Sequence, residues 1–143
     1  MAEAGNNTLR VRLVTPDSIL VDGTADSVEI PTRTGFIDVL AGHAPLLDEL
    51  GSGNVTLHGG SNDGQVYFVS QGFVEVLPER VTILAEIAMP PKQIDTALAQ
   101  QEMDRGQEMW RNAGDNGAKY DEANLLINEA QAELDAAHRG SRH

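Results

Sequence analysis

Cysteine is absent from the 143 residues, so the chain has no disulfide, no thiolate nucleophile and no thiolate metal site. Basic residues are scarce, since 10 Lys and Arg stand against 22 Asp and Glu and leave a formal net charge of −12. The acidic excess holds throughout, with four basic and twelve acidic residues in 1–89 and six and ten in 90–143. A negative field repels nucleic-acid phosphates and anionic lipid headgroups. Nucleic acid and bare membrane are therefore poor candidates as direct partners.

Long apolar runs are also missing. No uninterrupted run approaches the ~20 residues that span a bilayer, and residues 1–7 have neither the cationic run nor the apolar stretch of a signal or transit peptide. Aromatic residues make up only 4% of a chain that is 41% apolar, so a packed interior must consist mainly of Val, Leu, Ile and Ala. We expect a folded chain without a membrane span.

Residues 9–89 show the short apolar runs and frequent turn residues of a mainly antiparallel β-sandwich. Apolar and polar residues alternate over residues 9–13, 27–30 and 81–85, with Leu84 on the outward side of the last run. We expect no helix here, and turns at five places: Asp22-Gly23, residues 51–54, residues 59–64 with a hairpin tip at Asn62-Asp63-Gly64, Gln71-Gly72 and Pro78-Glu79.

From residue 90 onward, Ala, Gln and Glu replace the β-branched residues, and a Gly- and Asn-rich break at 112–117 predicts two antiparallel helices of about twenty residues. Spacings of three and four place apolar residues on one stripe of each helix. The first stripe contains Ala99, Met103, Gly106 and Trp110, preceded by Ile94 and Leu98; the second contains Tyr120, Ala123, Ile127, Ala130, Leu134 and Ala137. Gly106 suits a close helix–helix approach, and Trp110 suits the seam between the helices better than an external anchor. Both stripes are narrow, so we expect a weakly held, detachable hairpin.

The fold class is therefore α+β, an N-terminal antiparallel β-sandwich followed by a C-terminal antiparallel two-helix hairpin. We expect a flexible N-terminus at 1–8, the sandwich at 9–89, the hairpin at 90–138 and a flexible tail at 139–143.

Two segments and a first strand resemble the epsilon subunit of F-type ATP synthases, called delta in mitochondria. The first segment is Gly35-Phe36-Ile37-Asp38-Val39-Leu40 followed by Gly42-His43-Ala44-Pro45-Leu46-Leu47. The second segment comprises residues 72–78 and 81–86, and the first strand with its turn is Leu13-Val14-Thr15-Pro16-Asp17. The segments occur in the family's order, and the layout extends the resemblance over residues 9–137.

The resemblance implies a non-catalytic central-stalk subunit of a proton-translocating rotor, peripheral on the cytoplasmic face of a bacterial inner membrane. Its implied partners are the gamma subunit, the membrane ring and, through the hairpin, the catalytic alpha/beta head. It also implies protein contacts with gamma and the ring at Gly35, Phe36, Gly42, His43, Ala44 and Pro45. No cofactor is implied.

A degenerate nucleotide motif follows from the same resemblance. The family's pattern Ile/Leu-Asp-x-x-Arg-Ala corresponds to Ile94, Asp95 and Ala99, but Leu98 replaces the Arg. Leucine offers phosphate neither charge nor donors, and the second helix is acidic, so we expect neither ATP binding nor inhibition by a basic tail. An alternative hypothesis is an ATP-sensing module whose hairpin closes on nucleotide.

Catalysis is the least favoured hypothesis. His43 has no second His and no paired carboxylate near it in the sequence, so it suits a loop contact better than a general base or a metal ligand. The other histidines, His58, His138 and His143, are expected to be exposed, and the acidic residues lack calcium-loop spacing.

Overall fold

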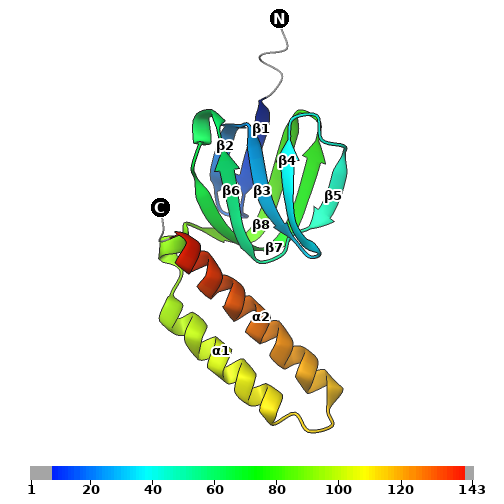
Figure 1. The fold of residues 1–143 in the computed structure, drawn as a ribbon, viewed down its shortest axis with the longest axis vertical. Coiled ribbons are helices and arrows are strands. Elements are labelled where there is room, and N and C mark those ends of the chain that lie inside the picture. The colour runs from blue at the N-terminus through cyan, green and yellow to red at the C-terminus, as the bar shows by residue number, and fades with distance from the viewer. Residues whose placement is uncertain (1–7, 141–143) are drawn as a thin grey trace, which may run out of the picture. The chain divides into compact units, whose positions relative to one another are not determined.

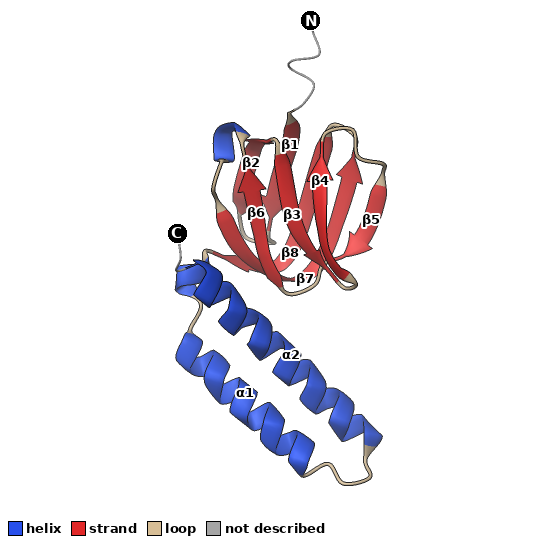
Figure 2. Cartoon of the chain, in the orientation of Figure 1, coloured by secondary structure: helices blue, strands red, loops and turns tan. Residues whose placement is uncertain are grey.

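A computed structural model describes residues 8–140, which form an eight-stranded β-sandwich and a helical hairpin (Figures 1 and 2). The strands are β1 (Leu9–Val14), β2 (Ile19–Ala25), β3 (Ser27–Thr32), β4 (Gly35–Leu40), β5 (Leu46–Glu49), β6 (Gly53–His58), β7 (Val66–Leu77) and β8 (Arg80–Met89). The helices are α1 (Thr96–Arg111) and α2 (Gly117–Gly140), and 3₁₀ turns occur at η2 (Gly60–Asn62) and η3 (Pro91–Gln93). The predicted α+β class is confirmed.

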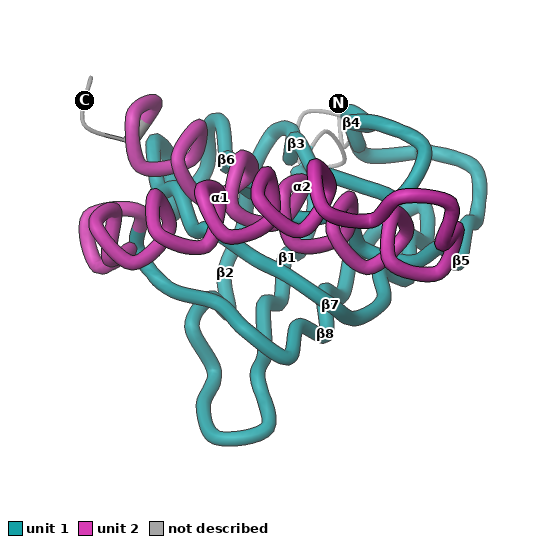
Figure 3. Tube along the Cα trace, turned by 90° about the horizontal axis from the view of Figure 1, so that it is seen from below, with its two compact units in different colours: residues 1–90 teal, residues 91–143 magenta. Residues whose placement is uncertain are grey.

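The chain divides into two compact units, one ending at Pro90 and the other starting at Pro91 (Figure 3). In the second unit α2 continues through Arg139 to Gly140, past the predicted helical limit at residue 138. The rest of the predicted flexible ends, 1–7 and 141–143, lies outside the described residues.

The strand order in the sandwich is β2-β1-β8-β7-β6-β3-β4, and β5 also pairs with β7. Every pairing is antiparallel except that of β1 with β8. The sandwich is thus mainly antiparallel, as the period-two pattern predicts. Seventeen buried side chains, mostly Val, Leu and Ile, form one core between the layers. Leu9, Val11 and Leu13 supply the β1 share of this core, which is the alternation visible in the sequence.

Strand β7 serves both layers because it bends at Gln71-Gly72. Before the bend it pairs with β6 over Val66 to Val69, and after it with β5 over Phe73 to Val76. Gln71 has a φ of 61° and Gly72 a φ of 148°, and a Cβ on Gly72 would lie 1.9 Å from the Leu84 carbonyl oxygen. Only glycine fits so close an approach. The predicted turn at Gln71-Gly72 is therefore wrong as a strand boundary, because the chain bends there without leaving the sheet.

Two other sequence expectations for the sandwich are also wrong. Asp22-Gly23 lies inside β2 and is not a turn; a Cβ on Gly23 would collide with Asn62, so the glycine makes room for the 59–65 loop. That loop contains the 3₁₀ turn η2, although no helix is expected before residue 90. Ser61 secures the loop, because its hydroxyl accepts hydrogen bonds from the Thr24 amide at 3.0 Å and the Thr24 hydroxyl at 3.1 Å.

The hairpin packs along the predicted stripes. Ala99, Met103 and Gly106 are buried on α1, and Ala123 and Ala130 on α2. A Cβ on Gly106 would lie 2.7 Å from Ile127 Cγ1 and 3.3 Å from the Ala123 carbonyl oxygen, so the helices meet closely at this glycine. The stripe on α2 ends at Ala136, which is buried, and not at the predicted Ala137. Leu98, expected to lead into the first stripe, is 52% exposed.

Aromatic packing holds the helices together at the turn between α1 and α2. The rings of Trp110 and Tyr120 meet edge to face at 5.2 Å, and the Tyr120 hydroxyl donates to the Gly114 carbonyl oxygen at 2.8 Å. Trp110 therefore lies at the seam between the helices, as expected. No helix within residues 8–140 is long and apolar enough to cross a bilayer.

Three carboxylates lower the stability of the hairpin. Burial raises the pKa of Glu133 above its ordinary value, and the negative charges of Glu129 and Glu102 raise it further. Arg105 lies near Glu102, but the pair is long at 3.9 Å and largely exposed. Because the ionised form of Glu133 is disfavoured in the folded hairpin, ionisation lowers the free energy of hairpin unfolding.

The first prediction concerns Gly106. Gly106→Val should destabilise the hairpin by about 1–3 kcal/mol, because the added methyl groups enter the space that Ile127 and the Ala123 backbone fill. Hydrogen exchange of α1 and α2 amides in the full chain measures the effect. Gly117→Val is the matched control, since a Cβ there meets nothing within 4 Å. Equal protection in the two variants would contradict the close approach.

The second prediction concerns pH. The folded-state pKa of Glu133 is raised above its ordinary value of 4.5. Hairpin stability is therefore greatest below pH 4.5, and it decreases as the pH rises through the raised pKa of Glu133. Protection factors of the helical amides, corrected for intrinsic exchange, should therefore fall as the pH rises above about 4.5. Glu133→Gln should raise protection at pH 7 and flatten this dependence, whereas the exposed Glu122→Gln should leave it unchanged. A wild-type profile that is already flat would refute the assignment.

Candidate functional site: protein-contact surfaces

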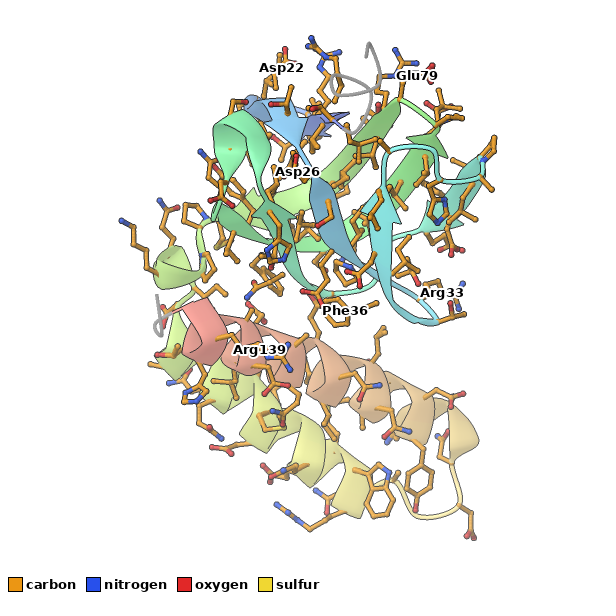
Figure 4. All side chains as sticks on the ribbon, turned by 45° about the horizontal axis from the view of Figure 1, so that its top comes forward. Asp22, Asp26, Arg33, Phe36, Glu79 and Arg139 are labelled. Carbon is orange, nitrogen blue, oxygen red and sulfur yellow. The ribbon has the colours of Figure 1, made fainter. Side chains whose placement is uncertain are left out.

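The predicted contact residues fall at the two ends of β4. Gly35 and Phe36 open the strand beside the β3–β4 turn, and Gly42, His43, Ala44 and Pro45 follow its other end in the loop to β5. From Phe36 to Leu40, the last residue of β4, the strand rises about 13 Å at about 3.3 Å per residue, and the 42–45 loop lies beyond Leu40. Figure 4 shows Phe36 with Arg33 at one end of the sandwich, and Asp22 with Glu79 at the opposite end. The structure therefore does not bring the six residues together in one site.

Phe36 presents an aromatic surface at the first end. Its side chain is 50% exposed, and it faces Pro31 across the β3–β4 ladder. A Cβ on Gly53 would lie 3.1 Å from the ring, so the ring covers the bare backbone of Gly53. Gly35 has a φ of 129°, and its carbonyl oxygen accepts a 2.6 Å hydrogen bond from the Thr32 hydroxyl, which fixes the turn.

The 42–45 loop at the other end is held by backbone hydrogen bonds. The Gly42 amide donates to the Pro78 carbonyl oxygen at 2.6 Å, and the His43 amide donates to the Leu40 carbonyl oxygen at 3.1 Å. Gly42 has a φ of 90° with open space around it, so glycine is needed there for its backbone conformation. The loop therefore has a defined backbone conformation, and its residues Ala44 and Pro45 face solvent.

The His43 ring makes a hydrogen bond within its own loop. Its Nδ1 donates to the Ala44 carbonyl oxygen at 2.7 Å, so the ring braces the loop. Within residues 8–140 no three His, Asp or Glu side chains gather where they could hold a metal ion. His58 and His138 are exposed, as expected, and His143 lies outside the described residues.

A third surface was not identified from the sequence. Phe73 and Leu84 are direct neighbours across the β7–β8 ladder, and both point outward with 53% and 54% of their surface exposed. Val14 on β1 lies next to Leu84 and continues the row. A shallow hollow of about 410 Å³ runs beside these side chains and is also lined by Pro16 and Gly72. We name Val14, Leu84 and Phe73 the apolar row.

A signal for the apolar row does exist in the sequence. In residues 81–85 the alternation places Leu84 on the outward side, where a polar residue is expected in a strand with one wet face. Large apolar side chains gathered on an exposed sheet face mark contact surfaces. Leu84 and Phe73 are two such side chains. That they are neighbours becomes clear only when the register between β7 and β8 is known.

The degenerate nucleotide motif has a structural role at the start of α1. Asp95 is the N-cap residue, and its carboxylate accepts a 3.0 Å hydrogen bond from the Leu98 amide. Ile94 and Ala99 are buried, whereas the Leu98 side chain points to solvent. Asp95 therefore stabilises the helix end, and the position of the family's Arg offers no cation.

Comparison with known proteins shows the family of this chain. Residues 8–91 match the family model described as ATP synthase, Delta/Epsilon chain, beta-sandwich domain. The ATP synthase epsilon chain of Halalkalibacterium halodurans is 39% identical over 132 residues, covering 92% of this chain and 98% of the relative. The ATP synthase epsilon chain 2 of Ralstonia nicotianae is 35% identical over 134 residues, covering 94% of this chain and 96% of the relative.

Solved structures share the fold. A chain in the mitochondrial ATP synthase of Euglena gracilis aligns with a TM-score of 0.77 at 20% identity, covering 92% of this chain and 81% of that one. A chain in the central stalk and c-ring of the Tetrahymena thermophila mitochondrial enzyme aligns with a TM-score of 0.64 at 14% identity, covering 90% and 96%. The sandwich matches the family model, and the relatives extend the match through the hairpin, so this chain belongs to the ATP synthase delta/epsilon chain family.

Proposed function

We propose that this chain is a non-catalytic central-stalk subunit of an F-type ATP synthase, which couples the membrane ring to the catalytic head through gamma. The observation that carries the proposal is the full-length similarity to ATP synthase epsilon chains, which spans both the sandwich and the hairpin. The chain acts as a part of a membrane-associated complex, and its bacterial relatives favour the cytoplasmic face of a bacterial inner membrane.

The two ends of β4 serve different partners in this proposal. Because about 13 Å of strand runs from Phe36 to Leu40 and the 42–45 loop begins beyond Leu40, one small contact does not include both. Gly42, His43, Ala44 and Pro45 form one contact, with the polar loops of the ring as the favoured partner. Gly35 and Phe36 form a second contact, in which the half-exposed aromatic ring is the anchor.

The apolar row is the surface that suits gamma. A stalk subunit must stay bound while torque passes through it, and stable interfaces have an apolar centre with a polar rim. Val14, Leu84 and Phe73 supply such a centre, and Glu86 and Thr15 border the adjoining hollow. The row lies on paired strands of the core, so its side chains are held rigidly before the partner arrives.

The third prediction tests this surface. Phe73→Ser with Leu84→Ser should weaken binding to gamma by about tenfold or more, because both apolar anchors are lost. Calorimetry or a pull-down with purified gamma measures the loss. The stability of the sandwich should change little, since both side chains are exposed. Leu125→Ser, on the other compact unit, is the matched control and should bind gamma like the wild type. Absence of any binding between the wild-type chain and gamma would refute the proposed function itself.

The fourth prediction concerns ATP. Calorimetric titration of the full chain with ATP should give no binding heat at millimolar nucleotide, since Leu98 supplies no charge to a phosphate and Asp95 is engaged as a helix cap. Leu98→Arg tests whether the missing cation is the reason, because nucleotide binding in that variant alone would identify it. Saturable heat with the wild-type chain would favour the ATP-sensing alternative.

A further inference from the structure

A basic groove lies on the outer face of the sandwich, at the end that carries Asp22 and Glu79 (Figure 4). Its volume is about 1030 Å³, and its lining includes three arginines, the carboxylates of Asp22 and Glu79, and the residues Gly42 and Pro78. All four basic residues of the sandwich sequence, residues 9–89, are arginines, and three of them line this groove: Arg10, Arg12 and Arg80. The positive charge of an otherwise acidic unit is therefore concentrated at one place.

Strand register brings these arginines together. Arg10 and Arg80 are direct partners in the parallel β1–β8 ladder, and Arg12 follows two residues later on the same face. Like charges placed directly opposite one another in a sheet are destabilising. A bound anion would relieve that repulsion, which gives the arrangement a functional reason.

Only part of this charge is neutralised within the chain. Asp22 lies opposite Arg12 in the β1–β2 ladder, yet its carboxylate accepts a 3.2 Å hydrogen bond from Arg10 Nη2. Arg12 and Arg80 make no side-chain hydrogen bond or ion pair with any residue in the range 8–140. Arg33, the fourth arginine, is paired with Glu49 at 3.0 Å, at the Phe36 end of the sandwich. Two guanidinium groups in the groove are thus available to a partner.

We infer that this groove binds an acidic segment of a neighbouring polypeptide through Arg12 and Arg80. The guanidinium group binds a carboxylate through two parallel hydrogen bonds, and adjacent arginines on one strand face match carboxylates along an extended segment. Small-molecule sites enclose their ligand and have few charged groups, whereas five charged side chains line this groove and its arginines are exposed. Exposed ion pairs are weak individually, so a segment that covers several of them and excludes water is the better fit.

The position of the groove agrees with this occupant. Gly42 forms part of its lining, and the Gly42 amide is bonded to Pro78 on the same rim. A polypeptide in contact with the 42–45 loop could therefore continue into the groove without a gap. The chemistry of the groove does not depend on which subunit contacts that loop.

The experiment uses the full-length, ¹⁵N-labelled chain and the peptide hexaglutamate at about 10 mM ionic strength, where screening is weak. Amide shifts should concentrate on β1 and β8 around Arg12 and Arg80, and binding should weaken with added salt. Arg12→Gln with Arg80→Gln should lower the affinity about tenfold or more, because both free guanidinium groups are removed. Arg33→Gln is the matched control and should change it less than about twofold, because that arginine lies at the other end.

Three outcomes would overturn the inference. The wild-type chain could fail to bind hexaglutamate, Arg33→Gln could lower the affinity as much as the double variant, or pyrophosphate could bind at least as tightly as the peptide. The third result would make the groove a site for small anions. Gamma binding by the same variants is measured separately, so failure of the proposed function and failure of the groove can be told apart.

Discussion

The close approach of Gly72 to the Leu84 carbonyl oxygen is the constraint on which the sandwich depends. It lets β7 bend at Gln71 and pair with β6 in one layer and with β5 in the other, so a single strand joins both halves of the core. The bend also sets the outer surface, because Phe73 directly follows Gly72 and Leu84 faces it. The apolar row and the core are thus placed by one backbone feature.

The hairpin is built with much less apolar surface. Its helices meet through Gly106 and small alanines, which allows a close approach but buries little area, and Glu102, Glu129 and Glu133 add repulsion across the same seam. The Trp110–Tyr120 contact and the Asp95 cap hold its two ends. The hairpin therefore rests on smaller buried side chains than the sandwich, which has a core of branched aliphatic residues.

Local patterns in the sequence were enough to predict most of the fold. Alternation identified the buried side of β1 and β8, and spacings of three and four identified Ala99, Met103 and Gly106 on α1. Glycine misled where it serves close approach: Gly23 and Gly72 suggested turns but lie inside strands. Surfaces depend on strand register, which no single segment contains. Hence the separation of Phe36 from His43, the row at Phe73 and the groove became visible only in three dimensions.

A subunit that couples two moving parts needs separate surfaces of different chemistry, because one shared surface would make its partners compete. Under the proposed function this sandwich offers three: a braced loop at one end of β4, an aromatic side chain at the other, and an apolar row on the face of β7 and β8. Its negative field disfavours unspecific contacts with acidic neighbours, except where Arg12 and Arg80 reverse the sign. Charge therefore selects where an acidic segment can dock, while apolar area determines how firmly the stalk is held.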